Sequence, residues 1–341
     1  MDERTVYSEH PETTQWEMLM QYSYELNVAK ELSRRRHSGP ESLPAAIAGA
    51  FSQAYEYFHT SSASSLYTSP LLVYYGMANL LSGACQMMAG SLLEVEGHGM
   101  SMLPIPKDRP PEHLADVTIC PSASATGALS VFGHLLCPQL DISRLGDWTL
   151  SELFARIPDL YDEYYGFYRA SFPGLIPVAR GTDGRVVVDR VEPELLERYP
   201  QLPEALDAIP GLSSAYLDPQ DVNMGGHRIV LYRRSSGSDI TLRAVSGSLF
   251  LCTGHGPTHA NPAPIQEILL YMTSFALSFL SRYHPELWNP FVKTDFTGER
   301  LVFAKCVDVT RRTFPNLVLN QLLGYSVEFG SEREQPKAIK I

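Results

Sequence analysis

The clearest hydrophobic period in the chain runs from Ser69 to about residue 93. Every third or fourth position there is apolar, which is the spacing of one helix face. That stripe consists of Leu71, Tyr74, Ala78, Leu81, Cys85 and Met88. The other faces are also mostly apolar, and a helix that is apolar nearly all round is normally central in a fold. The pattern therefore predicts a buried central helix, begun by Ser69 as a cap and Pro70 at the first position.

This helix lies in an uncharged stretch, because no Asp, Glu, Lys or Arg occurs between Glu56 and Glu94. Residues 70–93 are long enough to cross a bilayer. They also contain Asn, Ser, Gln and three glycines, which favours a helix in the core of a soluble protein over a membrane span. Gly76 and Gly83 are expected to let a neighbouring helix approach closely.

Further helices are expected on both sides of the middle of the chain. Residues 12–37 and 41–59 precede the central helix, and "HSGP" separates the two. Near the other end, residues 265–279 carry an apolar stripe, followed by helices at about 299–312 and 316–323. Pro315 is expected to separate that last pair.

The middle of the chain changes character. Short strands are expected at "DVTIC" and "LSVFGHLL", and short helices at "TLSELFARI" and at about residues 194–208. "LIPVARGTDGRVVVDRV" predicts a hairpin, and "HRIVLYRR" with "ITLRAVSGSLFLC" predicts a second. We therefore expect an α+β protein: residues 1–103 and 263–341 form one helical bundle, and 104–262 form a mixed insert with hairpins.

Composition narrows the function classes. The chain has 341 residues, 44% hydrophobic, and a formal charge of −11, which disfavours a broad electrostatic grip on nucleic acid. The small basic clusters at 34–36, 233–234 and 311–312 are more typical of solvated helix faces. Five scattered cysteines without a CxxC pair, and an N-terminus without a signal-peptide pattern, predict a cytoplasmic protein with reduced thiols.

Cys252, His255 and His259 have a C-x2-H-x3-H spacing that could bind zinc. A structural zinc site needs a fourth ligand, and none is adjacent in the sequence. The alternative is an ordinary Gly- and Pro-rich loop between a strand and a helix, with no cofactor. Both interpretations stay open at this point, with the loop favoured.

Three other residues are candidates for a catalytic or ligand site. His98 lies between Gly97 and Gly99, just after the central helix, in a turn that exposes it. Arg282 and His284 lie at an expected helix end, where cations also interact favourably with the helix dipole. If the three side chains meet in space at a cleft, a functional role gains over a structural one.

Four segments in order resemble the YaaC-like family, a group of bacterial proteins whose biochemical role is poorly defined. They are "SPLLVYYGMANLLSGAC" (Ser69–Cys85), "GHGMS" (Gly97–Ser101), "SRYHPELWNPF" (Ser281–Phe291) and "FPNLVLNQLLGY" (Phe314–Tyr325). The phosphate-loop, dinucleotide, nucleophile-elbow and HExxH motifs are missing from the sequence. The resemblance therefore implies a family without assigning a reaction.

The first of these segments also resembles, more distantly, the second helix of HEPN-type helical domains. Many such domains are ribonucleases that use an R-x4–6-H pair at a dimer interface. Here the only pair with that spacing is Arg4 and His10, just before Pro11, while Arg109 and His113 are one residue too close. The sequence therefore departs from the standard nuclease pattern.

Three functions follow as hypotheses. The first is a soluble interaction or regulatory protein on a HEPN-like scaffold, with a protein partner or a second copy of itself. The second is an enzyme acting on RNA or a nucleotide in a phage-defence or stress system, using His98, Arg282 and His284. The third is a metal-binding protein with zinc at Cys252, His255 and His259.

Overall fold

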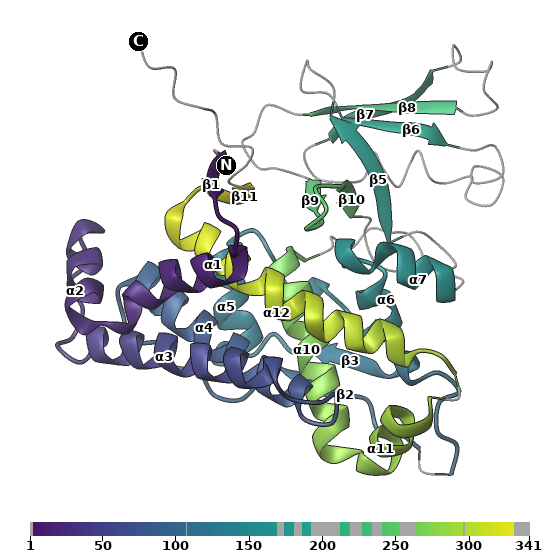
Figure 1. Ribbon diagram of the computed structural model, residues 1–341, viewed down its shortest axis with the longest axis horizontal. Helices are drawn as coiled ribbons and strands as arrows, with labels where there is room; N and C mark the ends of the chain where they lie inside the picture. Colours follow the sequence, from purple (N-terminus) through teal and green to yellow (C-terminus); the bar gives the residue numbers. More distant parts are fainter. Residues whose placement is uncertain are drawn as a thin grey trace. The chain divides into compact units, whose positions relative to one another are not determined.

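A computed structural model describes residues 3–106, 108–168, 174–180, 186–191, 212–218, 227–233, 241–252, 264–295 and 297–330 (Figure 1). Contacts group the chain into two compact units. The helical unit comprises Met1–Met102, Pro121–Ile142 and Leu270–Ile341, and the mixed unit comprises Leu103–Cys120 and Ser143–Leu269. The three-part division expected from the sequence, with boundaries at 103/104 and 262/263, stays a prediction.

The helical unit draws its elements from both ends of the chain. In order, they are β1 Glu3–Tyr7, α1 Pro11–Met20, a 3-10 helix Gln21–Ser23, α2 Glu25–Arg34, α3 Leu43–Ser62, α4 Ser69–Ala89, β2 Met100–Met102, α5 Ala128–Leu136, α10 Gln266–Tyr283 from Leu270 onward, α11 Pro285–Thr294, α12 Arg300–Leu323 and β11 Ser326–Gly330. The expected helix over 12–37 is divided, because Tyr24 adopts an extended conformation between α1 and α2.

The helix expected over residues 69–93 is present as α4, and it packs along α3 (Figure 1). Gly76 and Gly83 make this close approach feasible. A Cβ at Gly76 would lie 2.7 Å from the Phe58 ring, and one at Gly83 would lie 3.0 Å from the Phe51 ring. Both rings are buried. The two glycines, two helical turns apart, thus set the α3–α4 distance, as the sequence predicted.

The expectation of a strand at "LSVFGHLL" is wrong, because these residues form α5. A short, mostly apolar segment fits a buried helix as well as a buried strand.

The expected break at Pro315 is also absent, since α12 continues through it to Leu323. A proline inside a helix costs roughly 3 kcal/mol through its missing N–H and its ring. Burial of the neighbouring Phe314 and Val318 side chains offsets that cost.

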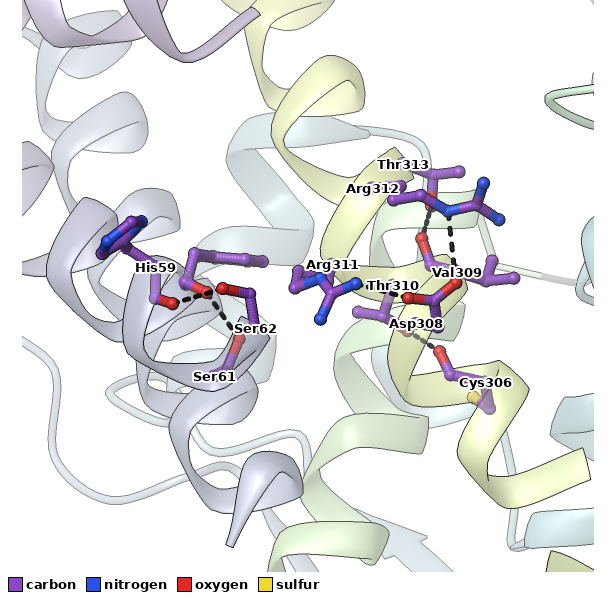
Figure 2. Close-up of polar contacts among 11 residues, drawn as sticks. His59, Ser61, Ser62, Cys306, Asp308, Val309, Thr310, Arg311, Arg312 and Thr313 are labelled. Atoms are coloured by element: carbon purple, nitrogen blue, oxygen red, sulfur yellow. Dashed lines mark hydrogen bonds and ion pairs between the residues drawn. The ribbon is translucent and has the colours of Figure 1, made fainter. Parts of the chain in front are cut away.

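Helix α12 packs against α4 and α1, and β11 beyond it pairs in parallel with β1. Its polar side chains bond locally, as Figure 2 shows: Thr310 Oγ1 donates to the Cys306 carbonyl over 2.8 Å, and Asp308 faces Arg311 and Arg312. On α3, Ser62 Oγ likewise donates to the His59 carbonyl. The two arginines of α12 are thus paired with a carboxylate of the same helix.

The mixed unit contains a short strand pair, a sheet and small helices. Its elements are a 3-10 helix Leu114–Asp116, β3 Thr118–Pro121, a 3-10 helix Ile142–Arg144, β4 Trp148–Thr149, α6 Leu150–Phe154, a 3-10 helix Pro158–Leu160, α7 Tyr161–Phe167, β5 Leu175–Arg180, β6 Val186–Val191, β7 Leu212–Asp218, β8 His227–Arg233, β9 Thr241–Arg243 and β10 Leu249–Cys252. Strand β3 pairs with β4 in antiparallel orientation, and a capping box between Thr149 and Glu152 begins α6.

The sheet of the mixed unit has the order β7-β8-β6-β5-β10-β9. The first expected hairpin is confirmed, because β5 and β6 pair in antiparallel orientation. The second is wrong: β8 lies between β6 and β7, whereas the segment expected as its partner forms its own hairpin, β9–β10. The helix expected at about 194–208 lies outside the described residues. The α+β prediction, mainly helical with a hairpin-containing insert, is confirmed.

Candidate functional site

The turn that carries His98 is fixed by backbone hydrogen bonds within the helical unit. The carbonyls of Gly97 and His98 accept from the N–H groups of Ala128 and Leu129, at 3.2 and 3.1 Å. These N–H groups are the first of α5, and the first N–H groups of a helix lack partners inside it. Gly97 and Gly99 both have positive φ, 74° and 69°, which glycine adopts at little cost. The sequence "GHG" therefore caps α5 and holds His98 in place.

The His98 side chain continues into a chain of hydroxyl groups. Its Nδ1 lies 2.7 Å from the Tyr74 hydroxyl on α4, and that hydroxyl lies 3.2 Å from the Tyr271 hydroxyl on α10. Tyr74 and Tyr271 each expose only 1% of their surface, and their rings are stacked 5.4 Å apart. Buried hydroxyls need hydrogen-bond partners, and here the chain from His98 to Tyr271 supplies them.

Arg282 is held at the end of α10 by two hydrogen bonds and two rings. Its Nη1 donates to the Tyr75 hydroxyl over 3.0 Å, and its Nε donates to the Ser278 carbonyl over 3.2 Å. The guanidinium lies 5.6 Å from the Tyr75 ring centre and 4.8 Å from that of Tyr283. Within the part of the chain that the structure describes, no carboxylate pairs with this half-buried cation. Arg282 is therefore positioned and still able to bind an anion.

A cleft of about 260 Å³ opens beside these groups in the helical unit. One wall is a face of α4, and the others come from the His98 turn, α5 and α10. The cleft is lined by Tyr74, Tyr75, Ala78, Asn79, Ser82, Val95, Gly97, His98, Ala128, Phe132 and Tyr271. Flat aromatic surfaces with a few polar groups are typical of small-molecule sites, and this one is slightly smaller than the usual range.

The electrostatics keep the hydrogen-bonded chain neutral. Burial lowers the pKa of His98, and the positive charge of Arg282 lowers it further. Burial raises the pKa of Tyr74 to about 12, against the opposing effects of its bond to Tyr271 and of Arg282. Burial also raises the pKa of Tyr271 well above its ordinary value. At neutral pH, Arg282 is thus the cation beside an uncharged His–Tyr–Tyr chain.

His284 lies apart from this cluster, although it follows Arg282 by only two residues. It occupies the cap position before α11, and its Nδ1 lies 3.0 Å from Glu286 Oε1. Its ring packs on Phe279. Neither His284 nor Arg282 is among the residues that line the cleft, but Arg282 donates to the hydroxyl of Tyr75, which is one of them. Trp288, in the next turn, is buried and donates to the Leu66 carbonyl. Of the three candidate residues, the structure brings together His98 and Arg282, and their chemical roles stay a prediction.

Sequence reasoning missed the tyrosines and Asn79 as site residues, because a helix that is apolar nearly all round was interpreted as core. One signal could have found them. Asn79 and Ser82 are polar positions in a mostly apolar helix, and they follow Tyr74 and Tyr75 at spacings of four to eight residues. Residues three and four apart share a helix face, so this pattern marks a polar strip on α4.

Comparison with known families decides the identity of the chain. The model of the YaaC-like protein family matches residues 6–322. The chain belongs to the YaaC-like family. The match includes all four segments that carried the resemblance up to Leu322, and it continues through the mixed middle of the chain. No curated protein matches the sequence. No solved structure matches it either.

In this YaaC-like protein, the zinc prediction concerns residues of which only one is described. His255 and His259 lie outside the described residues. Burial raises the pKa of the Cys252 thiol to about 11, against the charge of Arg156, and zinc binds the thiolate. Across the described ranges, no group of three or more His, Cys, Asp or Glu side chains is placed to hold a metal ion.

Two further findings concern the cysteines and the helices of this family member. All five cysteines are free thiols. None of the helices in the described ranges combines the length and apolar character needed to cross a membrane.

Proposed function

We propose that this YaaC-like protein is a regulatory protein whose helical unit binds a small anionic ligand in the cleft beside His98 and Arg282. One observation carries the proposal: Arg282 is held in place by Tyr75 and Ser278, yet has no carboxylate partner among the described residues. A half-buried cation costs desolvation energy unless an anion compensates it. An anionic ligand at the cleft would supply that compensation.

Regulation through a partner protein or a second copy of the chain is part of this proposal. The ligand would bridge α4, α10 and the His98 turn, which are remote in sequence. Binding that ties together such elements stabilises one arrangement of them. The HEPN-like character of α4, suggested by "PLLVYYGMANLLSGAC", is the reason to expect that two copies pair.

The second candidate is an enzyme that acts on RNA or a nucleotide, in phage defence or a stress response. One observation favours it. His98 is uncharged, oriented by the Tyr74 hydroxyl at 2.7 Å, and lines the cleft, which is the arrangement of a general base. His284 has no place in this version of the site, because it pairs with Glu286.

Anion binding tests the first proposal directly. Sulfate and inorganic phosphate are titrated into the purified protein by calorimetry, with thermal stability as a second readout. We expect saturable binding, and Arg282→Gln to weaken it by about tenfold or more. Arg311→Gln is the matched control, because Arg311 pairs with Asp308 on α12, which is not a residue of the cleft lining, whereas Arg282 bonds the lining residue Tyr75. If neither anion binds, or both variants weaken binding equally, the proposal is wrong.

The enzyme alternative is separated by a time course. Wild type and His98→Gln are incubated with total RNA and with mixed nucleotides, and the products are resolved by chromatography. Turnover that is lost in His98→Gln supports the enzyme. Binding without turnover supports the regulatory protein, and light scattering with and without sulfate then shows whether the ligand changes self-association.

A further inference from the structure

The α4 wall of the cleft has an aromatic ring and polar side chains in addition to the groups that an anion would need. Tyr75 lines the cleft, and its ring stacks with that of Tyr57 on α3, with ring centres 5.9 Å apart and 29° between the planes. Arg282 donates to the Tyr75 hydroxyl. These contacts fix the orientation of the ring, so the part of Tyr75 that lines the cleft is a preformed aromatic surface.

Asn79, one helical turn further along α4, faces the same cleft. Its Nδ2 donates to the Tyr75 carbonyl over 2.9 Å, and because a carbonyl can only accept, this bond fixes which end of the amide is oxygen. Among the described residues, its Oδ1 and its second N–H have no partner. The side chain thus offers the cleft one acceptor and one donor, side by side.

Ser82 completes this strip. Its hydroxyl accepts from Gln86 Nε2 over 3.1 Å, which leaves its own proton to donate. From Tyr75 to Ser82 the helix rises roughly 10 Å, at about 1.5 Å per residue. The polar strip therefore reaches from Tyr75, whose hydroxyl bonds Arg282, to the donors and acceptor of Asn79 and Ser82.

From this arrangement we infer that the ligand is a mononucleotide. Its base lies against Tyr75, with its polar edge on Asn79 and Ser82, and its phosphate lies at Arg282 and His98. An amide is the side chain that pairs with a base edge through one donor and one acceptor. Aromatic rings are the surfaces on which bases stack. This inference rests on the proposed function, because it requires an anion at Arg282.

The size of the cleft favours one nucleotide over a longer strand. Its volume, about 260 Å³, is below the usual range of ligand sites. The chain as a whole carries a charge of −11, which opposes the binding of a polyanion along the surface. Arg282, which has no carboxylate partner among the described residues, is a cation available to one phosphate.

The test compares ligands that share the phosphate and differ in the base. AMP, GMP, CMP and UMP are titrated into the full chain by calorimetry, beside ribose 5-phosphate and inorganic phosphate. We expect at least one nucleotide to bind about tenfold or more tightly than ribose 5-phosphate, because stacking and the amide contact add to the phosphate contact. This comparison uses the wild-type protein and does not depend on the folding of any variant.

Two variants then locate the base. Asn79→Ala is expected to reduce the preference for the nucleotide over ribose 5-phosphate, because stacking on Tyr75 remains but the amide contact is lost, and to leave ribose 5-phosphate binding unchanged. Asn27→Ala is the matched control, because Asn27 on α2 also bonds a backbone carbonyl and lies outside the cleft. It should change neither affinity.

The outcomes separate the two proposals. If ribose 5-phosphate binds as tightly as every nucleotide, the base inference is overturned and the anion proposal stands. If nucleotides are preferred but Asn79→Ala leaves the preference intact, the assignment of the base edge is overturned. If no phosphate compound binds, both proposals are overturned.

Discussion

Replacement of Gly76 by alanine tests the packing that positions the cleft. In the middle of a helix, alanine is ordinarily preferred over glycine by about 1 kcal/mol. At Gly76, however, the new Cβ would lie 2.7 and 2.9 Å from two ring atoms of Phe58 and 3.2 Å from the Cβ of Tyr57. Phe58 exposes only 2% of its surface, so the ring has no free space to enter. We therefore expect the steric cost to exceed the gain in helix propensity.

The magnitude follows from a matched pair of variants. Overpacking a core costs typically 1–3 kcal/mol. Gly49 lies on the exposed face of α3 with nothing within 4 Å of a built Cβ, so Gly49→Ala should gain the full propensity difference, about 1 kcal/mol. Gly76→Ala should lie below Gly49→Ala by the steric cost, about 1–3 kcal/mol in the free energy of unfolding. Gly83→Ala, with the Phe51 ring at 3.0 Å, should fall between them.

Urea denaturation measures these differences, followed by far-UV circular dichroism and by tryptophan fluorescence. Trp16 on α1 packs against Phe58, with ring centres 5.3 Å apart, so its fluorescence reports on the disturbed contact. The comparison is sound where both probes give the same transition and the variants share one m value. If Gly76→Ala is as stable as Gly49→Ala, the α3–α4 contact does not depend on these glycines.

Four further predictions concern the hydrogen-bonded chain and the cation beside it. Tyr74→Phe should lower the free energy of unfolding by about 1–2 kcal/mol, measured in urea, because His98 and Tyr271 both lose a partner; an unchanged value would contradict this. Sulfate affinity should rise as the pH falls, by at most about tenfold per pH unit, because a bound anion raises the lowered pKa of His98; a flat profile for wild type, or the same slope in His98→Gln, would contradict it. In the absence of anions, the folded protein binds a proton at His98 less readily than the unfolded chain does, because the pKa of His98 is lowered on folding. The free energy of unfolding should therefore fall as the pH drops below about 6.5, and it should fall less in His98→Gln. Arg282→Lys should bind sulfate more weakly than wild type and more tightly than Arg282→Gln, since lysine keeps the charge but loses the planar fork; equal binding by the two variants would show that charge is irrelevant there.

The helical part of the fold was predictable wherever a long period was present. The α4 pattern recurs over six positions, and both its existence and its glycine contacts follow from the sequence. At α5 the mostly apolar segment spans only eight residues, 129–136, and its two polar positions, Ser130 and His134, are too few to set a period. Such a run is decided by its surroundings, here the capping carbonyls of Gly97 and His98.

Strand pairing was less accessible, because it depends on contacts between distant segments. The β5–β6 hairpin is local and carries its turn signal in its own sequence. Strand β8 also precedes a turn-forming segment, yet its partners are β6 and β7, about 40 and 15 residues earlier in the chain. A turn signal alone does not exclude a pairing that the rest of the sheet stabilises.

The candidate site shows the same limit at the level of side chains. The flanking glycines identify His98 as a candidate from the sequence. No local pattern identifies Tyr271, which is 197 positions away from Tyr74, the residue it bonds. Conversely, Arg282 and His284 were grouped because they are neighbours. Helix α10 ends at Tyr283 between them, so the chain turns there and their side chains bond to different partners. Proximity in sequence predicts a shared site only within one element.

The two interpretations of the "GHG" turn, structural and functional, concern different atoms of the same residue. The carbonyl groups of Gly97 and His98 accept hydrogen bonds from the first N–H groups of α5, which have no partner inside the helix, and this is a structural role. The same bonds fix the backbone, and Tyr74 then fixes the imidazole through Nδ1. Because both are held, the His98 side chain, whose Nε2 has no partner among the described residues, lines the cleft in an orientation that needs little loss of rotamer entropy on binding. A histidine rigidly positioned for structural reasons is thereby preorganised for a ligand, so the cap on α5 supports the functional proposal for His98.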